Sequence, residues 1–128
     1  MVTNACLNRV YLLSGVDNGS GDPPVKIGTS FTAELSWPRS IGLGWDLDVG
    51  DINLDGWPDL LLGTNGDADG SIFLFFNTGE SPFYQGDPGS ILTDTDYFGI
   101  GVALGDFDGN GLPDLAVGTL KDMLYIYY

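Results

Sequence analysis

Two nine-residue segments, 55 residues apart, carry the same pattern of oxygen-bearing side chains. The first runs from Asp51 to Asp59 and the second from Asp106 to Asp114, and each has Asp or Asn at positions 1, 3, 5 and 9. Each also has Gly at position 6, where a backbone with positive φ allows a sharp turn. One such segment is typical of an ordinary Asp- and Gly-rich turn. Two copies in matching contexts indicate a shared role, with the side-chain oxygens of each segment converging on one point.

Convergent carboxylate and amide oxygens are the ligands that Ca²⁺ prefers, usually six to eight of them at about 2.3–2.6 Å. We therefore predict two calcium sites, with the backbone carbonyl of position 7 as a further ligand in each. The predicted ligands of the first site are Asp51, Asn53, Asp55, the carbonyl of Trp57, and Asp59. Those of the second site are Asp106, Asp108, Asn110, the carbonyl of Leu112, and Asp114.

The flanking sequence separates these loops from helix-loop-helix calcium sites. An EF-hand needs a bidentate Glu at position 12, where this chain has Leu62 and Val117. A dockerin-type calcium loop also requires an acidic residue at position 12, so it is excluded on the same ground. Short apolar runs closed by Gly and Thr follow both loops, at 60–64 and 115–119. Such runs are typical of buried strands, so each loop is predicted to join two strands.

The composition favours strands and loops over helices. Sixteen of the 18 acidic residues are Asp, a turn residue, and only two are Glu, a helix former. The 20 Gly and seven Pro agree with an all-β fold. With four basic residues the formal net charge is −14, which argues against nucleic acid and anionic membranes as partners. No apolar stretch is long enough to be inserted in a membrane as a helix.

Several features argue against an enzyme. The chain has no His, which excludes His-based triads and the commonest general base. Paired carboxylates are also used by glycosidases, but each conspicuous Asp pair here already has a place in a loop or turn.

Cys6 is the only Cys, so an intrachain disulfide is excluded. It is expected to be a small apolar residue, with an intermolecular disulfide as the alternative. Residues 1–14 lack the pattern of a signal peptide.

The two segments belong to an internal repeat. Residues 42–64 and 97–119 align with nine identities in 23 positions, a periodicity typical of solenoids, propellers and arrays. The expected strands of the complete unit are 43–50, 60–64, 72–76 and a weaker one near 90–95. Those of the second unit are 98–105, 115–119 and 123–128, and two strands of an earlier unit are expected at 9–15 and 25–32. We therefore divide the chain into a partial N-terminal blade (1–40), a complete blade (41–96) and a partial C-terminal blade (97–128).

The segment from Phe98 to Gly118 resembles an FG-GAP repeat, and the segment from Leu43 to Gly63 resembles it too, with Leu43-Gly44 where Phe-Gly is usual. FG-GAP repeats and the related VCBS repeats form the four-stranded antiparallel blades of β-propellers in integrin α-subunits and in many secreted proteins. The resemblance implies that each loop joins the first two strands of a blade. It also implies calcium ligands at positions 1, 3, 5, 7 and 9 and an extracellular or cell-surface location.

The departure from that family lies in the number of blades. A closed propeller needs about four to eight, and this chain encodes about two, which would leave an incomplete ring with open edges. Either the chain is a piece of a longer protein, or copies complete one another head to tail as a ring or filament. The predicted function is a calcium-binding extracellular structural protein that assembles with other copies. The alternative is an adhesion module that binds a glycan or a surface protein.

Other residues have two interpretations each. We expect three tryptophans to pack between blades: Trp37, Trp45 and Trp57. Stacking on sugars is the alternative, and the packing interpretation is weakest for Trp57 because it lies on a loop. Asp46 and Asp48 are expected to be hydrogen-bonded or solvent-facing rather than a further cation site. Turns are expected at 17–19, at 67–70 and around Asp94 and Asp96, with metal binding as the alternative. Tyr125, Tyr127 and Tyr128 are expected in an edge strand that packs on a partner, with a ligand site as the alternative.

Overall fold

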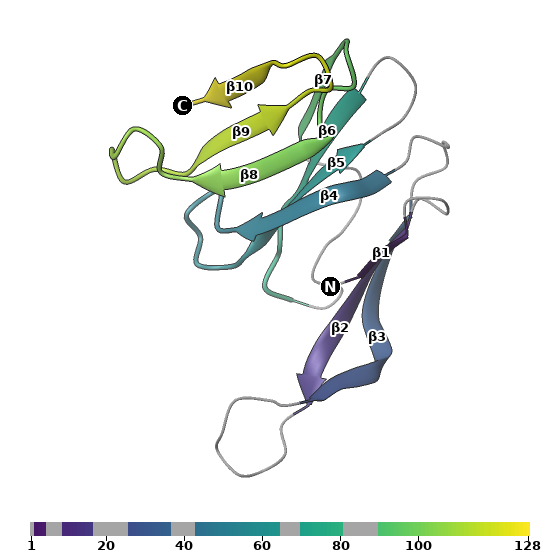
Figure 1. Ribbon diagram of the computed structural model, residues 1–128. Helices are drawn as coiled ribbons and strands as arrows, with labels where there is room; N and C mark the ends of the chain where they lie inside the picture. The colour runs from purple at the N-terminus through teal and green to yellow at the C-terminus, as the bar shows by residue number, and fades with distance from the viewer. Residues whose placement is uncertain (1, 5–8, 17–25, 37–42, 65–69, 81–89) are drawn as a thin grey trace.

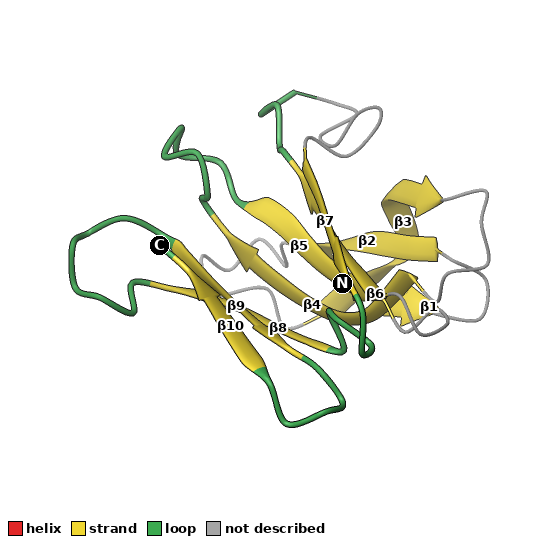
Figure 2. Cartoon of the chain, turned by 90° about the horizontal axis from the view of Figure 1, so that it is seen from above, coloured by secondary structure: helices red, strands yellow, loops and turns green. Residues whose placement is uncertain are grey.

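The computed structural model describes residues 2–4, 9–16, 26–36, 43–64, 70–80 and 90–128. These residues form antiparallel sheets and, within the described part of the chain, no helix (Figures 1 and 2). The strands are β1 (Val2–Asn4), β2 (Arg9–Val16), β3 (Lys26–Ser36), β4 (Leu43–Gly50), β5 (Asp59–Thr64), β6 (Gly70–Phe75), β7 (Ser90–Asp94), β8 (Gly101–Gly105), β9 (Asp114–Gly118) and β10 (Leu124–Tyr127). The all-β prediction is confirmed.

The first repeat forms a four-stranded sheet in the order β4-β5-β6-β7. We call it the central sheet. The second repeat forms a three-stranded sheet in the order β8-β9-β10, which we call the C-terminal sheet. Matching pairs define the same register in both, because Gly63 pairs with Ile72 in the central sheet and Gly118 pairs with Leu124 in the C-terminal sheet. The two repeats are therefore built on one plan, which the second follows without an outer strand.

The third sheet contains β1, β2 and β3 in that order. Sequence analysis expected two strands here and did not predict β1, which pairs with β2 through Val2 and Tyr11. A strand of three residues has no alternation that a sequence can reveal. In both views this sheet lies on one side of β4 and the C-terminal sheet lies on the other (Figures 1 and 2).

The apolar cluster between the central and C-terminal sheets holds them face to face. Its fully buried members are Leu61 and Ile72 from the central sheet and Phe98 and Val117 from the second repeat. The Phe98 ring meets the Tyr125 ring edge-on, with centroids 5.6 Å apart. Burying large apolar side chains in this way contributes about 1.5–3 kcal/mol each, so the interface is a main source of stability for the C-terminal sheet.

Gly63 lets the two sheets approach closely. A Cβ built at Gly63 would lie 1.9 Å from the backbone oxygen of Gly99, and one built at Gly70 would lie 1.8 Å from that of Phe98. The Phe98-Gly99 backbone therefore passes directly over two glycines of the preceding repeat. The backbone before β8 is not extended, because Asp96, Tyr97 and Gly99 all have positive φ. The strand predicted at 98–105 therefore begins only at Gly101.

The other predicted strands of the two repeats are found within a few residues of their expected bounds. Four earlier interpretations lie outside the described residues: those of Cys6, Trp37, the turn at 17–19 and most of the turn at 67–70.

Candidate metal centres

The loop between β4 and β5 is closed by hydrogen bonds from its own backbone to its own acidic side chains. The carboxylate of Asp51 accepts from the N–H groups of Asp55 (2.9 Å) and Gly56 (2.8 Å). Gly56 has φ of +91°, as its position in the loop predicted, and Leu54 is also left-handed with φ of +59°. These two residues reverse the chain, so that position 1 faces the later positions of the loop.

The loop between β8 and β9 repeats these contacts. Gly111 donates to Asp106 Oδ2 at 2.9 Å, as Gly56 does to Asp51. Gly109 and Gly111 have φ of +78° and +83°, which matches the left-handed pair of the first loop. Figure 1 shows both loops at the same end of their sheets. The 55-residue sequence repeat is thus a repeat of loop conformation.

Positions 3 and 5 exchange Asp and Asn between the two loops. Asn53 Nδ2 donates to Asp55 Oδ2 at 2.9 Å in the first, and Asn110 Nδ2 donates to Asp108 Oδ2 at 3.0 Å in the second. Each loop therefore has one amide and one carboxylate at these positions and three carboxylates in all. The amide donor reduces the repulsion among carboxylates, and both side chains still offer oxygens with further lone pairs.

Position 9 is buried in both loops and differs in its partners. Asp59 Oδ2 accepts from the Ile52 N–H (3.0 Å) and Asp59 Oδ1 from the Asn77 N–H (2.8 Å). Asp114 Oδ2 accepts from the Phe107 N–H at 2.7 Å, whereas its Oδ1 is buried and has no hydrogen-bond partner. A buried carboxylate oxygen without a partner costs about 1–3 kcal/mol or more, so this atom calls for a proton donor or a cation.

The second loop also brings three carboxylates together. Asp106, Asp108 and Asp114 each offer an oxygen within 4.8 Å of the others. Among the described residues this is the one group of three acidic side chains that meets the distance. In the first loop, the carboxylate oxygens of Asp51, Asp55 and Asp59 do not all lie within 4.8 Å of one another. The chemistry of both donor sets, carboxylate and amide oxygen throughout, fits a hard divalent cation.

A hollow of about 350 Å³ lies between the two loops. Its lining combines the acidic residues that begin the loops with exposed apolar side chains, and it includes Val49, Asp51, Leu54, Leu104, Asp106 and Leu112. The two candidate centres are therefore neighbours at one end of the sheets.

Asp46 and Asp48 on β4 do not belong to these centres. Asp46 Oδ2 accepts from the Val102 N–H of β8 at 2.9 Å, and its Oδ1 accepts from the Leu47 N–H at 3.0 Å. Asp48 makes the same pair of contacts with Leu104 (2.7 Å) and Val49 (2.8 Å). The expectation of hydrogen-bonded acids is confirmed. Sequence analysis did not predict their role, which is to join the facing edges of β4 and β8.

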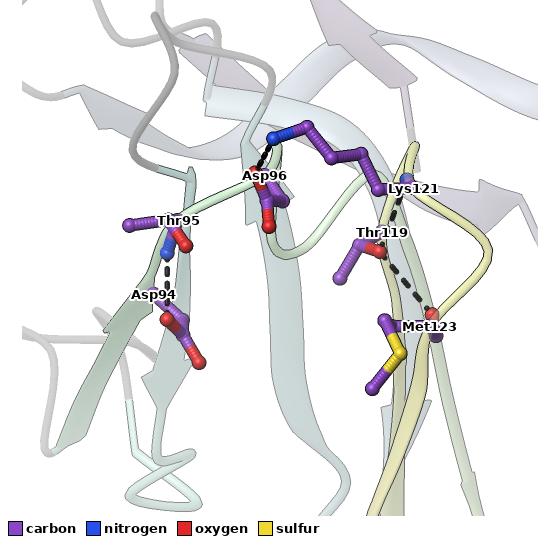
Figure 3. A network of polar contacts seen from close by, with 6 residues as sticks. All are labelled: Asp94, Thr95, Asp96, Thr119, Lys121 and Met123. Atoms are coloured by element: carbon purple, nitrogen blue, oxygen red, sulfur yellow. Dashed lines mark hydrogen bonds and ion pairs between the residues drawn. The ribbon is translucent and has the colours of Figure 1, made fainter.

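Asp94 and Asp96 are part of a turn network rather than a metal site (Figure 3). Asp94 accepts from the Thr95 N–H at 2.7 Å, and Asp96 forms an exposed ion pair with Lys121. Thr119 accepts from the Lys121 N–H at 3.3 Å and donates to the Met123 carbonyl at 3.4 Å. These contacts tie the segment after β7 to the turn between β9 and β10.

Apart from Tyr125, which packs on Phe98, the described aromatic candidates lie at the surface. Trp45 and Trp57 are 53% and 49% exposed, so neither is sequestered between blades in the described structure. The Trp57 ring lies against Gly79, where an added Cβ would come within 2.6 Å of it. Partial burial raises the pKa of the Tyr127 hydroxyl, and Asp94 and Tyr125 raise it further. Tyr128 is exposed.

These observations define a class: antiparallel blades in which an Asp-rich loop joins the first two strands of each repeat. The sequence model of one protein family, the FG-GAP-like repeat, matches residues 51–117, which are 67 of the 128 residues. The chain belongs to the FG-GAP repeat family. The match covers both candidate loops and the strands between them.

Integrin α-subunits are among the relatives of this chain. It is 36% identical to integrin alpha-6 of Gallus gallus over 85 residues, which is 62% of this chain and 8% of that protein. It is 36% identical to integrin alpha-7 of Homo sapiens over 103 residues (68% and 8%). It is 31% identical to integrin alpha-PS5 of Drosophila melanogaster over 115 residues (81% and 10%). The chain thus spans about a tenth or less of each relative. In the described residues no helix has the length and apolar character needed to cross a membrane.

Proposed function

We propose that this chain is a non-catalytic, extracellular module whose two Asp-rich loops bind Ca²⁺. The observation that carries the proposal is Asp114, whose buried Oδ1 lacks a partner and whose carboxylate groups with those of Asp106 and Asp108. A cation at that point would satisfy the orphaned oxygen and neutralise three like charges at once. The ligands are those predicted from the sequence, with the carbonyls of Trp57 and Leu112 completing each set.

Electrostatics supports two ions per chain. Three carboxylates within one loop repel one another, and two bound Ca²⁺ ions would change the formal net charge from −14 to −10. The role of the ions is structural: they hold the loop between the first two strands of each repeat. Such a module needs Ca²⁺ at the concentrations found outside cells, which agrees with the integrin relatives.

The two sites are expected to differ in affinity. Each oxygen of Asp59 accepts one backbone hydrogen bond, whereas Asp114 accepts two on Oδ2, from the N–H groups of Phe107 and Asp108, and none on Oδ1. The hydrogen bond to Asp59 Oδ1 comes from Asn77, which follows the Phe75–Leu60 pair by two residues. The second loop therefore gains more from a cation, and we expect it to bind Ca²⁺ more tightly.

Thermal unfolding in calcium and in EDTA tests this proposal. A ligand at a hundred times its Kd stabilises the folded state by about 2.7 kcal/mol, or roughly 10 °C for a chain of this size. We expect Asp106→Asn to lose most of that shift and the exposed Glu80→Gln to retain it. An unfolding temperature that is the same in both buffers would contradict a structural role for Ca²⁺.

A second proposal concerns assembly. The C-terminal sheet has three strands, and the outer edge of β10 has no partner strand in the described structure. An open edge is a template for another strand, which supports head-to-tail completion of sheets between copies in a ring or filament. Light scattering coupled to size exclusion, in calcium and in EDTA, tests it. Masses above the 13.6 kDa of one chain that fall in EDTA support it, and one chain mass throughout overturns it.

An adhesion module that binds a glycan or a surface protein is the alternative function. It is favoured by Trp45 and Trp57, whose exposed rings could stack on sugars. A glycan array with the wild type and Trp57→Ala distinguishes the two: specific binding that the variant loses supports recognition, and no binding leaves the structural role as the better account.

A further inference from the structure

A short turn after β6 contacts the end of the first candidate metal loop. It consists of residues 77–79, and we call it the 77–79 turn. Asn77 Oδ1 accepts a hydrogen bond from the Gly79 N–H at 2.9 Å, which closes the turn. The turn lies outside the nine-residue motif of 51–59, so the sequence pattern that predicted the calcium ligands does not include it.

Asn77 holds positions 8 and 9 of the loop. Its N–H donates to Asp59 Oδ1 at 2.8 Å, and its Nδ2 donates to the Pro58 carbonyl at 3.1 Å. Asn77 is 8% exposed and Asp59 is fully buried. Hydrogen bonds in such a low-dielectric site are stronger than in water, so they fix the end of the loop firmly.

Gly79 holds position 7. A Cβ built at Gly79 would lie 2.6 Å from Cε2 and Nε1 of the Trp57 ring, so the ring packs on bare backbone. Gly79 has φ of +72°, a conformation that glycine adopts without strain. Positions 7, 8 and 9 of the loop therefore all contact the same turn.

We propose that the 77–79 turn positions the last two ligands of the first calcium site and sets the affinity of that site. These ligands are the carbonyl of Trp57 and the carboxylate of Asp59. The inference rests on the calcium binding proposed above. Asn77 and Gly79 are positioning residues, since they hold the ligands and are not ligands themselves.

The bonds to Asp59 leave its carboxylate able to bind an ion. Oδ1 accepts from Asn77 and Oδ2 from the Ile52 N–H at 3.0 Å, so the group is held from both sides. Each oxygen keeps a further lone pair. The side chains at positions 1, 3 and 5, by contrast, are joined by exposed hydrogen bonds within the loop. The 77–79 turn therefore ties the loop to the segment that follows β6.

Ligands that are held in place affect both affinity and selectivity. Removing the groups behind the ligands of a metal typically lowers its affinity by about 10–100-fold. Mg²⁺ needs ligands at about 2.0–2.1 Å, whereas Ca²⁺ accepts about 2.3–2.6 Å and a less regular geometry. Two held ligands resist contraction around the smaller ion, so we expect the turn to favour Ca²⁺ over Mg²⁺.

Isothermal titration calorimetry of the first site alone tests the proposal. Asp114→Asn removes the second site, and CaCl₂ then titrates the first. In this background we expect Asn77→Ala to weaken Ca²⁺ binding by about ten-fold or more and Mg²⁺ binding by less. In the reciprocal Asp59→Asn background, the same substitution should leave the second site unchanged.

Thr64→Val is the matched control. It removes the acceptor of the Ser71 N–H in the same sheet, but at the end of β5 that lies away from the loop. It should lower the unfolding temperature and change the Ca²⁺ affinity of the first site by less than about two-fold. An equal loss of affinity in Thr64→Val and Asn77→Ala would mean that affinity follows overall stability, which overturns the proposal.

Gly79→Ala tests the turn from its other end and does not depend on whether Asn77→Ala folds. The added methyl group should displace the Trp57 ring and weaken Ca²⁺ binding. Trp57→Leu removes the ring and keeps the carbonyl, so Gly79→Ala should reduce affinity less in that background than in the parent with Trp57. An equal reduction in both would assign the effect to backbone strain and overturn the role given to Gly79.

Hydrogen exchange in EDTA measures the positioning without an ion. Asn77→Ala should speed exchange of the Ile52 N–H, which donates to Asp59, and Thr64→Val should not. Normal Ca²⁺ binding that Asn77→Ala and Gly79→Ala leave unchanged would overturn this inference alone. An Asp114→Asn parent that binds no Ca²⁺ would overturn the proposed first calcium site, and with it the role of the turn in affinity.

Discussion

Asp48 on β4 accepts a hydrogen bond from the Leu104 N–H on β8 at 2.7 Å, across a separation of 56 residues. With the equivalent contact between Asp46 and Val102, it joins two strand edges that no ladder connects. The residues of β8 that align with Asp46 and Asp48 are Gly101 and Ala103. The carboxylates are therefore supplied by one repeat and used by both.

Replacing Asp48 should weaken the contact between the two sheets. In Asp48→Ala the part-buried Leu104 N–H loses its acceptor, and the expected destabilisation is about 1.5 kcal/mol. Urea denaturation measures it. The exposed Glu80→Ala is the control and should change the unfolding free energy by less than about 0.5 kcal/mol. Equal effects of the two substitutions would argue against the role given to Asp48.

A methyl group at Gly63 should be far more damaging than one at Gly118, although the two glycines are equivalent in the repeat. Ala at position 63 would bring its Cβ to 1.9 Å from the Gly99 oxygen, whereas the nearest atom at position 118 is 3.8 Å away. We expect Gly63→Ala to cost about 3 kcal/mol or more and Gly118→Ala less than about 1 kcal/mol, measured by thermal unfolding of dilute protein. Similar costs would contradict the close passage of residues 98–99 over the central sheet.

Leu54 is a site for stabilisation. It is left-handed and exposed, and Gly109 has the equivalent position in the second loop. The left-handed conformation costs an L-residue about 1–2 kcal/mol, and a glycine avoids that cost. A glycine also loses more chain entropy on folding, which costs about 0.5–1 kcal/mol. Leu54→Gly should therefore stabilise the protein by about 0.5 kcal/mol in EDTA. A clear loss of stability would mean that the Leu54 side chain makes contacts that offset the backbone strain.

The ion pair between Lys121 and Asp96 should contribute little. Both side chains are exposed, and such pairs typically add less than about 1 kcal/mol. Lys121→Ala is expected to lower stability by no more than about 0.5 kcal/mol, with no dependence on salt beyond error. A larger loss that disappears at 1 M NaCl would show that the turn network of Figure 3 depends on this charge pair.

The local parts of this structure could be predicted from the sequence. The left-handed Gly56 and Gly111 and the strands on either side of each loop follow from spacing and residue type. The non-local parts could not. The partner of Asp48 lies in the next repeat, the start of β8 is set by the passage of Gly99 over Gly63, and the difference between Asp59 and Asp114 depends on Asn77. Each is decided by a contact between strands that the sequence separates widely.

The central claim, that both loops bind Ca²⁺, is tested most directly by isothermal titration calorimetry of metal-free protein with CaCl₂. We predict two sites per chain of unequal affinity, with Asp114→Asn losing the tighter site and Asp59→Asn the weaker one. A titration without binding heat at millimolar calcium at several temperatures, or a stoichiometry unchanged by both variants, would contradict the account.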